Sequence, residues 1–222
     1  IGERDGRDSP MNRLTLSIQY RLASAIFVHT EQMNRQLQDI FHVPVSKIQV
    51  IPFPLNNAVP DTVMDGATAR ASLGIGPEER VLLFYGQVAP YKGLEYLVQS
   101  LVHLRKTGTP YRLLIAGRIK KNAEDYWKEI QETISRSDLA SLILSRIEFI
   151  PDEETEIYFK AADVLVLPYV YIFQSGVLFL SYNFGLPVLA ADVGSLKENI
   201  VEGRTGFVFR PKDPLSLART IE

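Results

Sequence analysis

Residues 159–209 read FKAADVLVLPYVYIFQSGVLFLSYNFGLPVLAADVGSLKENIVEGRTGFVF, and no charged residue lies between Asp163 and Asp192. A run of this length is compatible with a membrane-spanning helix, which needs about 20 apolar residues. Proline and glycine break or weaken a single helix, however. Such interruptions lie at Pro168, Gly176, Gly185 and Pro187. We therefore expect no membrane span here.

The same run separates into three shorter elements. Residues 164–167 and 187–190 have the composition of buried strands, and residues 176–183 that of a buried helix. A strand, a helix and a second strand make a βαβ unit. Strands that are apolar throughout are typical of parallel sheets covered on both faces. The segment thus predicts a parallel α/β sheet.

The rest of the chain continues this alternation. Further strands are expected at 25–28, 48–51, 81–85, 111–116, 147–150 and 206–209. Further helices are expected at 11–22, 31–41, 67–73, 94–104, 123–137, 153–162 and 215–221. Thr30 and Asp152 are the expected N-caps of two of these helices. Strands alternating with helices favour an α/β fold with a doubly wound, parallel Rossmann-like sheet.

A boundary is expected after the strand at 48–51. Pro52 and Pro54 bracket the end of that strand, and the residues that follow are rich in asparagine, proline and aspartate. This composition is typical of a linker. We divide the chain into an N-terminal part at 1–54, a linker at 55–65 and a Rossmann-like domain at 66–222, and we expect a piece of a larger protein.

Composition excludes several classes of function. A net charge of −2 over 222 residues gives no electrostatic reason to expect a nucleic-acid partner. The chain has no cysteine and only three scattered histidines, so neither a disulfide nor a zinc site is expected. Residues 1–10 are polar rather than an apolar leader. We expect a cytoplasmic protein, and peripheral attachment of the full-length protein to the inner face of a membrane stays open.

Ligands of an open parallel sheet bind at the carboxyl ends of its strands. The loops that follow strands here lie at 86–93, 117–121, 150–153 and 169–176. The last loop leads into a helix start, where the backbone N–H groups of Ser175, Gly176 and Val177 would attract phosphate. Lys92 precedes another helix and would add positive charge. The alternatives are an ordinary helix cap and a solvated surface lysine.

Other chemistries find less support. Neither the Walker phosphate loop nor the dinucleotide fingerprint is present. A hydrolase nucleophile at Ser175 would need glycine at position 173, which is Phe173. Asp152, Glu153 and Glu154 stand at a helix start, where the helix dipole favours acidic side chains. We interpret them as a helix cap and expect no metal site.

The order and spacing of several motifs resemble the C-terminal half of a retaining glycosyltransferase of family 4 (group 1), which has the two-domain GT-B fold. The motifs are AIFVHT (25–30), KIQVIPFP (47–54), LLFYGQVAPYKGLEYLVQSL (82–101), LLIAGR (113–118), IEFIPDEETEIYFKAADVLVLPY (147–169) and SGVLFLSYNFGLPVLAADVGSLKENIVEGRTGFVF (175–209). The resemblance covers about residues 20–222. By it, residues 1–54 end the acceptor-binding domain and residues 66–222 bind the donor.

The resemblance implies transfer of a sugar, with retention, from a nucleotide-diphosphate sugar to an acceptor that it does not define. Members of this fold usually need no metal or other cofactor. The donor-binding residues that it implies are Gly86, Gln87, Lys92, Gly117, Ile150, Gln174, Ser175, Gly176, Val177 and Glu198. Among them, Lys92 matches a phosphate-binding lysine, and Gln174 would contact the sugar. No catalytic residue is assigned.

Three positions depart from the family pattern. Gln87 stands where the family has an arginine, and Ile172 and Leu180 stand where it has two glutamates. Residues 174–177, Gln-Ser-Gly-Val, resemble a variant loop found in some members. One alternative is therefore a catalytically degenerate member that binds a nucleotide or a partner. A second is an epimerase, which would need an acid/base group beyond the run at Asp152.

Overall fold

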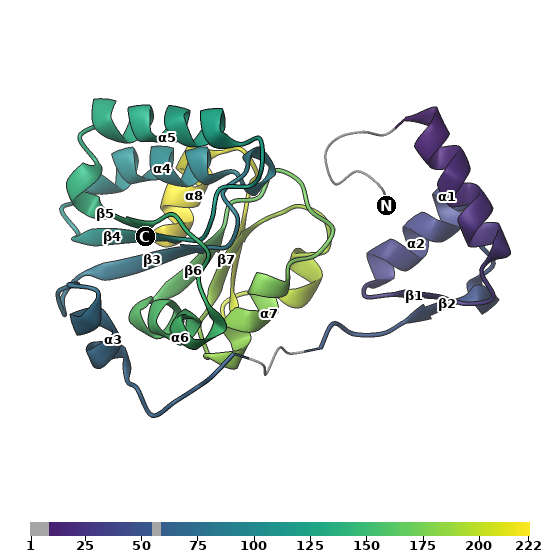
Figure 1. Ribbon diagram of the computed structural model, residues 1–222, viewed down its shortest axis with the longest axis horizontal. Coiled ribbons are helices and arrows are strands. Elements are labelled where there is room, and N and C mark those ends of the chain that lie inside the picture. The colour runs from purple at the N-terminus through teal and green to yellow at the C-terminus, as the bar shows by residue number, and fades with distance from the viewer. Residues whose placement is uncertain (1–8, 55–58) are drawn as a thin grey trace.

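The computed structural model describes residues 9–54 and 59–222, which form a smaller N-terminal part and a larger C-terminal part (Figure 1). The linker predicted at 55–65 begins outside the described residues, at 55–58. Residues 59–65 contain no helix or strand. Val59 is nevertheless buried in the core of the larger part, so this stretch of the connection packs onto that part.

A parallel sheet forms the centre of the larger part. Its described strands, in spatial order, are β5 (Ile143–Arg146), β4 (Tyr111–Ala116), β3 (Arg80–Tyr85), β6 (Val164–Leu167), β7 (Val188–Ala191) and β8 (Gly206–Phe209). One face is covered by α4 (Leu94–Leu104), α5 (Glu124–Arg136) and α8 (Pro214–Ile221) (Figure 1). The other face is covered by α3 (Gly66–Ser72), α6 (Asp152–Ala161) and α7 (Gly176–Asn183) (Figure 1). The predicted doubly wound α/β fold is confirmed.

The predicted βαβ unit is formed by β6, α7 and β7. α7 begins and ends where the sequence predicts, and Gly185 follows it with a φ of 63°. Every residue of β7 is buried, as expected of a strand between two neighbours in a covered sheet. Within the parts of the chain that the structure describes, no helix combines the length and apolar character needed to cross a membrane.

The strand order creates a crevice. From β3 the chain moves outward through β4 to β5, and then returns to β6 on the other side of β3. Where strand order reverses in this way, connections leave on opposite sides and a crevice opens at the carboxyl ends. The loops after β3 and β6 flank this crevice, so two of the four predicted ligand-binding loops meet there.

Two local predictions are wrong. The strand expected at 147–150 lies earlier, at β5, because Gly117 N–H bonds the carbonyl of Arg146 and ends the pairing there. As an edge strand, β5 needs fewer apolar residues than the following segment suggests, and Phe149 is 66% exposed. Asp152 is the first residue of α6 rather than its cap, and Pro151 holds the cap position without a side-chain hydrogen bond.

The smaller part consists of two helices and two parallel strands among its described residues. They are α1 (Pro10–Leu22), β1 (Ile26–Val28), α2 (Glu31–Phe41) and β2 (Ile48–Val50). Thr30 caps α2 as predicted, because its side chain accepts a hydrogen bond from the N–H of Met33. A small core surrounds the fully buried Leu37.

Candidate functional site

Two cavities open at the carboxyl ends of the strands. The first, which we call the α7 cavity, has a volume of about 580 Å³ and is lined by Phe53, Pro54, Tyr91, Lys92, Ile172, Gln174, Ser175, Gly176, Val177 and Leu180. The second, the β3–β4 cavity, has a volume of about 210 Å³ and is lined by Tyr85, Gly86, Gln87, Gly117, Arg118, Phe149 and Ile150. All the predicted donor-binding residues except Glu198 line one cavity or the other.

Glycine joins the two cavities. Gly86 ends β3 with a φ of 106°, and a Cβ atom there would lie 3.8 Å from Val177 Cγ2 and 4.0 Å from Lys92 Nζ. Gly117 has a φ of 140°, and its Cβ would lie only 1.9 Å from the carbonyl oxygen of Gly86. A side chain at Gly117 would therefore push the two loops apart. One extended ligand could reach both cavities by passing Gly86.

Lys92 carries the central charge of the α7 cavity. The short 3-10 helix Pro90–Lys92 places it just before α4, and the residue is only 6% exposed. Its Nζ donates to the Tyr169 hydroxyl at 2.5 Å and lies 4.1 Å from the centre of that ring. In the described part of the chain, Lys92 has no carboxylate within ion-pair distance. A buried ammonium group without a counter-charge is costly, so this site favours an anion from solvent.

The start of α7 adds hydrogen-bond donors to the same cavity. Ser175 holds the N-cap position, but its hydroxyl makes no cap bond and lies 3.1 Å from the Tyr169 hydroxyl. The first N–H groups of a helix have no partner inside the helix. The backbone at Gly176 and Val177 is therefore suited to an anion, and the dipole of α7 adds to the attraction.

The amide of Gln174 is also suited to a ligand. Both its nitrogen and its oxygen are buried and have no hydrogen-bond partner among the described residues. Such groups are rare, because leaving a buried donor or acceptor unsatisfied costs about 1–3 kcal/mol. A ligand with hydroxyl groups would satisfy both amide atoms.

Two basic residues near the site were not singled out by the sequence reasoning, although the loop containing them was. The Arg118 guanidinium lies 5.9 Å from the centre of the Phe149 ring beside the β3–β4 cavity. Lys120 Nζ lies 5.3 Å from the centre of the Tyr91 ring. Basic residues at a strand end were the available signal, but their separation from Lys92 could not be known.

Glu198 does not join the other predicted residues. Its carboxylate lies 3.5 Å from the guanidinium of Arg35 on α2, and it lines neither cavity. The acidic run at the start of α6 is likewise occupied elsewhere, since Glu154 pairs with Arg146. The described residues contain no group of three His, Cys, Asp or Glu side chains that could hold a metal ion.

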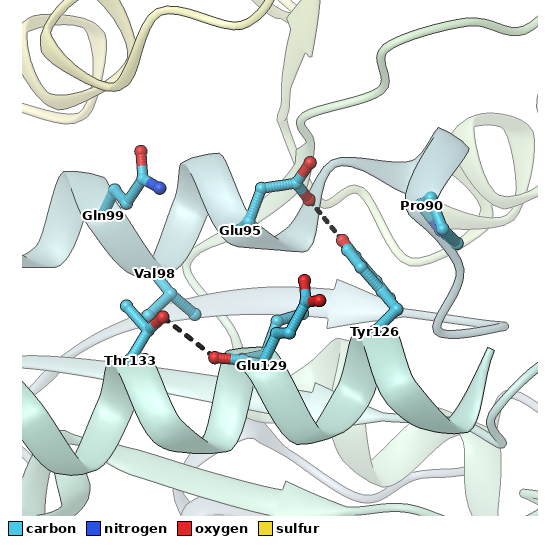
Figure 2. A pocket seen from close by; sticks show the side chains of 8 residues that line it. Pro90, Glu95, Val98, Gln99, Tyr126, Glu129 and Thr133 are labelled. Carbon is cyan, nitrogen blue, oxygen red and sulfur yellow. Dashed lines mark hydrogen bonds between the residues drawn. The ribbon is translucent and has the colours of Figure 1, made fainter.

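A further hollow of about 500 Å³ lies between α4 and α5 (Figure 2). Figure 2 shows the Tyr126 hydroxyl pointing from α5 to the Glu95 carboxylate on α4, to which it donates a hydrogen bond. Burial raises the pKa of Glu95, and burial together with this bond raises the pKa of Tyr126. These two groups satisfy one another, so we assign the pair a structural role in joining the helices.

The region around the two cavities matches a known family. Residues 79–222, which hold both strand-end loops and α7, match the family described as “Glycosyl transferases group 1”. The chain belongs to this family. A D-inositol 3-phosphate glycosyltransferase of Nocardia farcinica is 30% identical over 196 residues, which are 85% of this chain and 42% of that protein. An uncharacterized glycosyltransferase of Methanocaldococcus jannaschii is 26% identical over 85% of this chain and 47% of its own length.

Solved glycosyltransferases share the fold. Sucrose-phosphate synthase from Thermosynechococcus elongatus aligns with a TM-score of 0.84 and 23% identity over 100% of this chain and 54% of its own. Anabaena HepE in complex with UDP and glucose aligns with a TM-score of 0.83 and 21% identity over 96% of this chain and 57% of its own. These alignments confirm that the fold is the C-terminal half of a GT-B glycosyltransferase. The chain spans about half the length of the curated relatives it matches.

Proposed function

We propose that this protein transfers a sugar, with retention, from a nucleoside diphosphate sugar to an acceptor. The observation that carries the proposal is Lys92, a buried ammonium group that has no described carboxylate partner and lies beside the uncapped start of α7. Both features attract the same diphosphate. They would stabilise the negative charge that develops on the leaving nucleotide, without requiring a metal or another cofactor.

The proposed donor extends across both cavities. Its base occupies the β3–β4 cavity, and its diphosphate passes Gly86 to reach Lys92 and the N–H groups of Gly176. The sugar then lies deeper in the α7 cavity, where the unpaired amide of Gln174 meets its hydroxyl groups. Because the similar HepE structure contains UDP and glucose, uridine nucleotides are the first to test.

The proposed acceptor side lies toward the N-terminal part. Phe53 and Pro54 line the α7 cavity from that part, in agreement with assigning residues 1–54 to the end of an acceptor-binding domain. The acceptor itself has no chemical definition in this half of a GT-B fold. We therefore assign no catalytic acid, base or nucleophile to the described residues.

The second candidate function is nucleotide binding without transfer. It is favoured by Ile172 and Leu180, two apolar side chains that line the α7 cavity at the positions where the family pattern has glutamates. Neither side chain can accept a hydrogen bond from a sugar hydroxyl. Gln174 and the backbone of α7 remain to hold the donor in this alternative.

Calorimetric titration with UDP, GDP and ADP tests the nucleotide site. We expect one nucleotide to bind, and Lys92→Ala to weaken it about 10- to 100-fold, because hydrogen bonds to charged groups contribute about 1.5–3 kcal/mol. Lys121→Ala is the control, since it removes the same charge from an exposed position. Equal affinity of both variants would contradict the assignment of Lys92.

Release of UDP from UDP-glucose, followed over hours in the full-length protein, separates the two candidate functions. A transferase is expected to show slow donor hydrolysis that Lys92→Ala abolishes. Tight binding without any release would favour the binding protein. When an acceptor is known, the anomeric configuration of the product measured by NMR tests retention.

A further inference from the structure

The loop after β4 brings a second lysine to the same part of the molecule as Lys92. The N–H of Val88 bonds the carbonyl of Arg118 at 2.9 Å, and the N–H of Lys120 bonds the carbonyl of Val88 at 2.9 Å. These bonds form a parallel bridge between the loop after β3 and the loop after β4. The backbone of Lys120 is thereby held beside the segment that carries Tyr91 and Lys92.

One aromatic ring lies close to both ammonium groups. Lys120 Nζ is 5.3 Å from the centre of the Tyr91 ring, and Lys92 Nζ is 5.7 Å from the same centre. The carbonyl of Tyr91 accepts a hydrogen bond from the N–H of Val170, so the ring is also tied to the loop after β6. The electron-rich face of tyrosine attracts cations, and it holds the two lysines near each other despite their like charge.

We infer that Lys120 is a second phosphate-binding residue, which supplies the charge that Lys92 alone cannot. This inference rests on the proposed function. A diphosphate carries more than one negative charge, whereas the loop after β3 offers Lys92 and the neutral Gln87. Two ammonium groups near the α7 cavity create a stronger positive potential than one, and such a potential favours a doubly charged anion.

The inference predicts a dependence on phosphate rather than on the nucleoside. Lys120 is half-buried beside Tyr91, which lines the α7 cavity and not the β3–β4 cavity. Removing its charge should weaken a nucleoside diphosphate and leave the corresponding nucleoside unchanged. Because the interaction is electrostatic and close to solvent, the loss should shrink as the salt concentration rises.

The experiment titrates wild type, Lys120→Ala, Lys120→Arg and Lys121→Ala with UDP, GDP, ADP and the matching nucleosides at low and high salt. For the diphosphate that wild type binds, we expect Lys120→Ala to weaken binding about tenfold, which is about 1.4 kcal/mol. Lys120→Arg should retain most of the affinity, and Lys121→Ala should match wild type. Denaturant unfolding of each variant checks that the fold is intact.

The outcomes separate this inference from the function on which it rests. Equal diphosphate affinity of Lys120→Ala and Lys121→Ala, with wild type binding normally, overturns the inference alone. An equal loss of nucleoside and diphosphate affinity in Lys120→Ala also overturns it, because the effect would then not concern phosphate. Absence of any nucleotide binding by wild type overturns the nucleotide site and Lys120 together.

Discussion

Lys92 shows how one residue can serve binding at the expense of stability. Its ammonium group is buried and donates to the Tyr169 hydroxyl, which also lies near Ser175 Oγ. Desolvation of a charge is costly, and a neutral hydroxyl offsets only part of that cost. The fold therefore holds Lys92 in a state that an incoming anion would relieve.

Replacement of Lys92 by methionine tests this interpretation. Methionine has a similar length and no charge, and Tyr169 would keep Ser175 as a hydrogen-bond partner. We expect Lys92→Met to have an unfolding free energy equal to that of wild type or higher by about 1–3 kcal/mol, while nucleotide binding is lost. Urea denaturation and calorimetry measure the two effects. A marked loss of stability would mean that Lys92 supports the fold.

At the scale of elements, α4 and α5 are joined by a buried polar pair. Figure 2 shows Glu95 and Tyr126 facing one another across the space between these helices. Apolar contacts also join the two helices, including those of Val98 and Ile130. The pair makes the packing of α5 sensitive to pH, because burial raises the pKa of the Glu95 carboxyl above its ordinary value.

The sign of this pH dependence follows from proton linkage. The folded protein binds the Glu95 proton more tightly than the unfolded chain, so this group's contribution is full below the ordinary glutamate pKa of about 4.3 and falls as pH rises through the raised value. Glu95→Gln should remove this fall and keep an acceptor for Tyr126. The measurement is the unfolding free energy between pH 4 and pH 8, taken as the difference between variant and wild type.

That difference isolates Glu95 from carboxylates of opposite slope. Hydrogen bonds from Thr62 lower the pKa of Glu156, whose contribution is instead lost as pH falls. This contribution is common to wild type and Glu95→Gln, and it cancels. A difference that does not change with pH would contradict the raised pKa of Glu95.

At the scale of the whole molecule, the smaller part is attached to the larger one beside the α7 cavity. Phe53 stacks on Phe179 of α7 with ring centres 4.9 Å apart. The Ser195 hydroxyl lies 2.8 Å from Thr30 Oγ1 and donates to Gln32 at 3.0 Å. The backbone N–H of Ser195 also bonds the carbonyl of Phe173, so one loop contacts both α2 and the cavity wall.

Ser195→Ala should loosen this attachment without unfolding the sheet. Its hydroxyl is buried, and its loss leaves Thr30 and Gln32 without that partner. We expect the amides of α2 to exchange hydrogen faster, with little change in β3 or β6, as measured by hydrogen–deuterium exchange. Ser181→Ala is the matched control, because that buried hydroxyl bonds only the carbonyl of Leu178 in its own helix. Equal effects of both variants would contradict a role in attachment.

Local sequence determined most of the elements and the loops that form the site. Residues 176–183 form α7 as predicted, because apolar composition and flanking glycine specify a short buried helix. The carboxyl ends of parallel strands share one edge, so naming the loops was enough to find nearly all the cavity-lining residues. The prediction at 147–150 was wrong because apolar residues after an edge strand serve the core without pairing.

Contacts between loops were decided only by the tertiary structure. Nothing in the sequence around Tyr169 indicates that its hydroxyl accepts a bond from Lys92, or that Lys120 and Lys92 lie near the same Tyr91 ring. Glu198 turned out to face Arg35 for the same reason. Periodicity and propensity act over a few neighbouring residues, whereas these contacts depend on strand order, which brings together loops that are far apart along the chain.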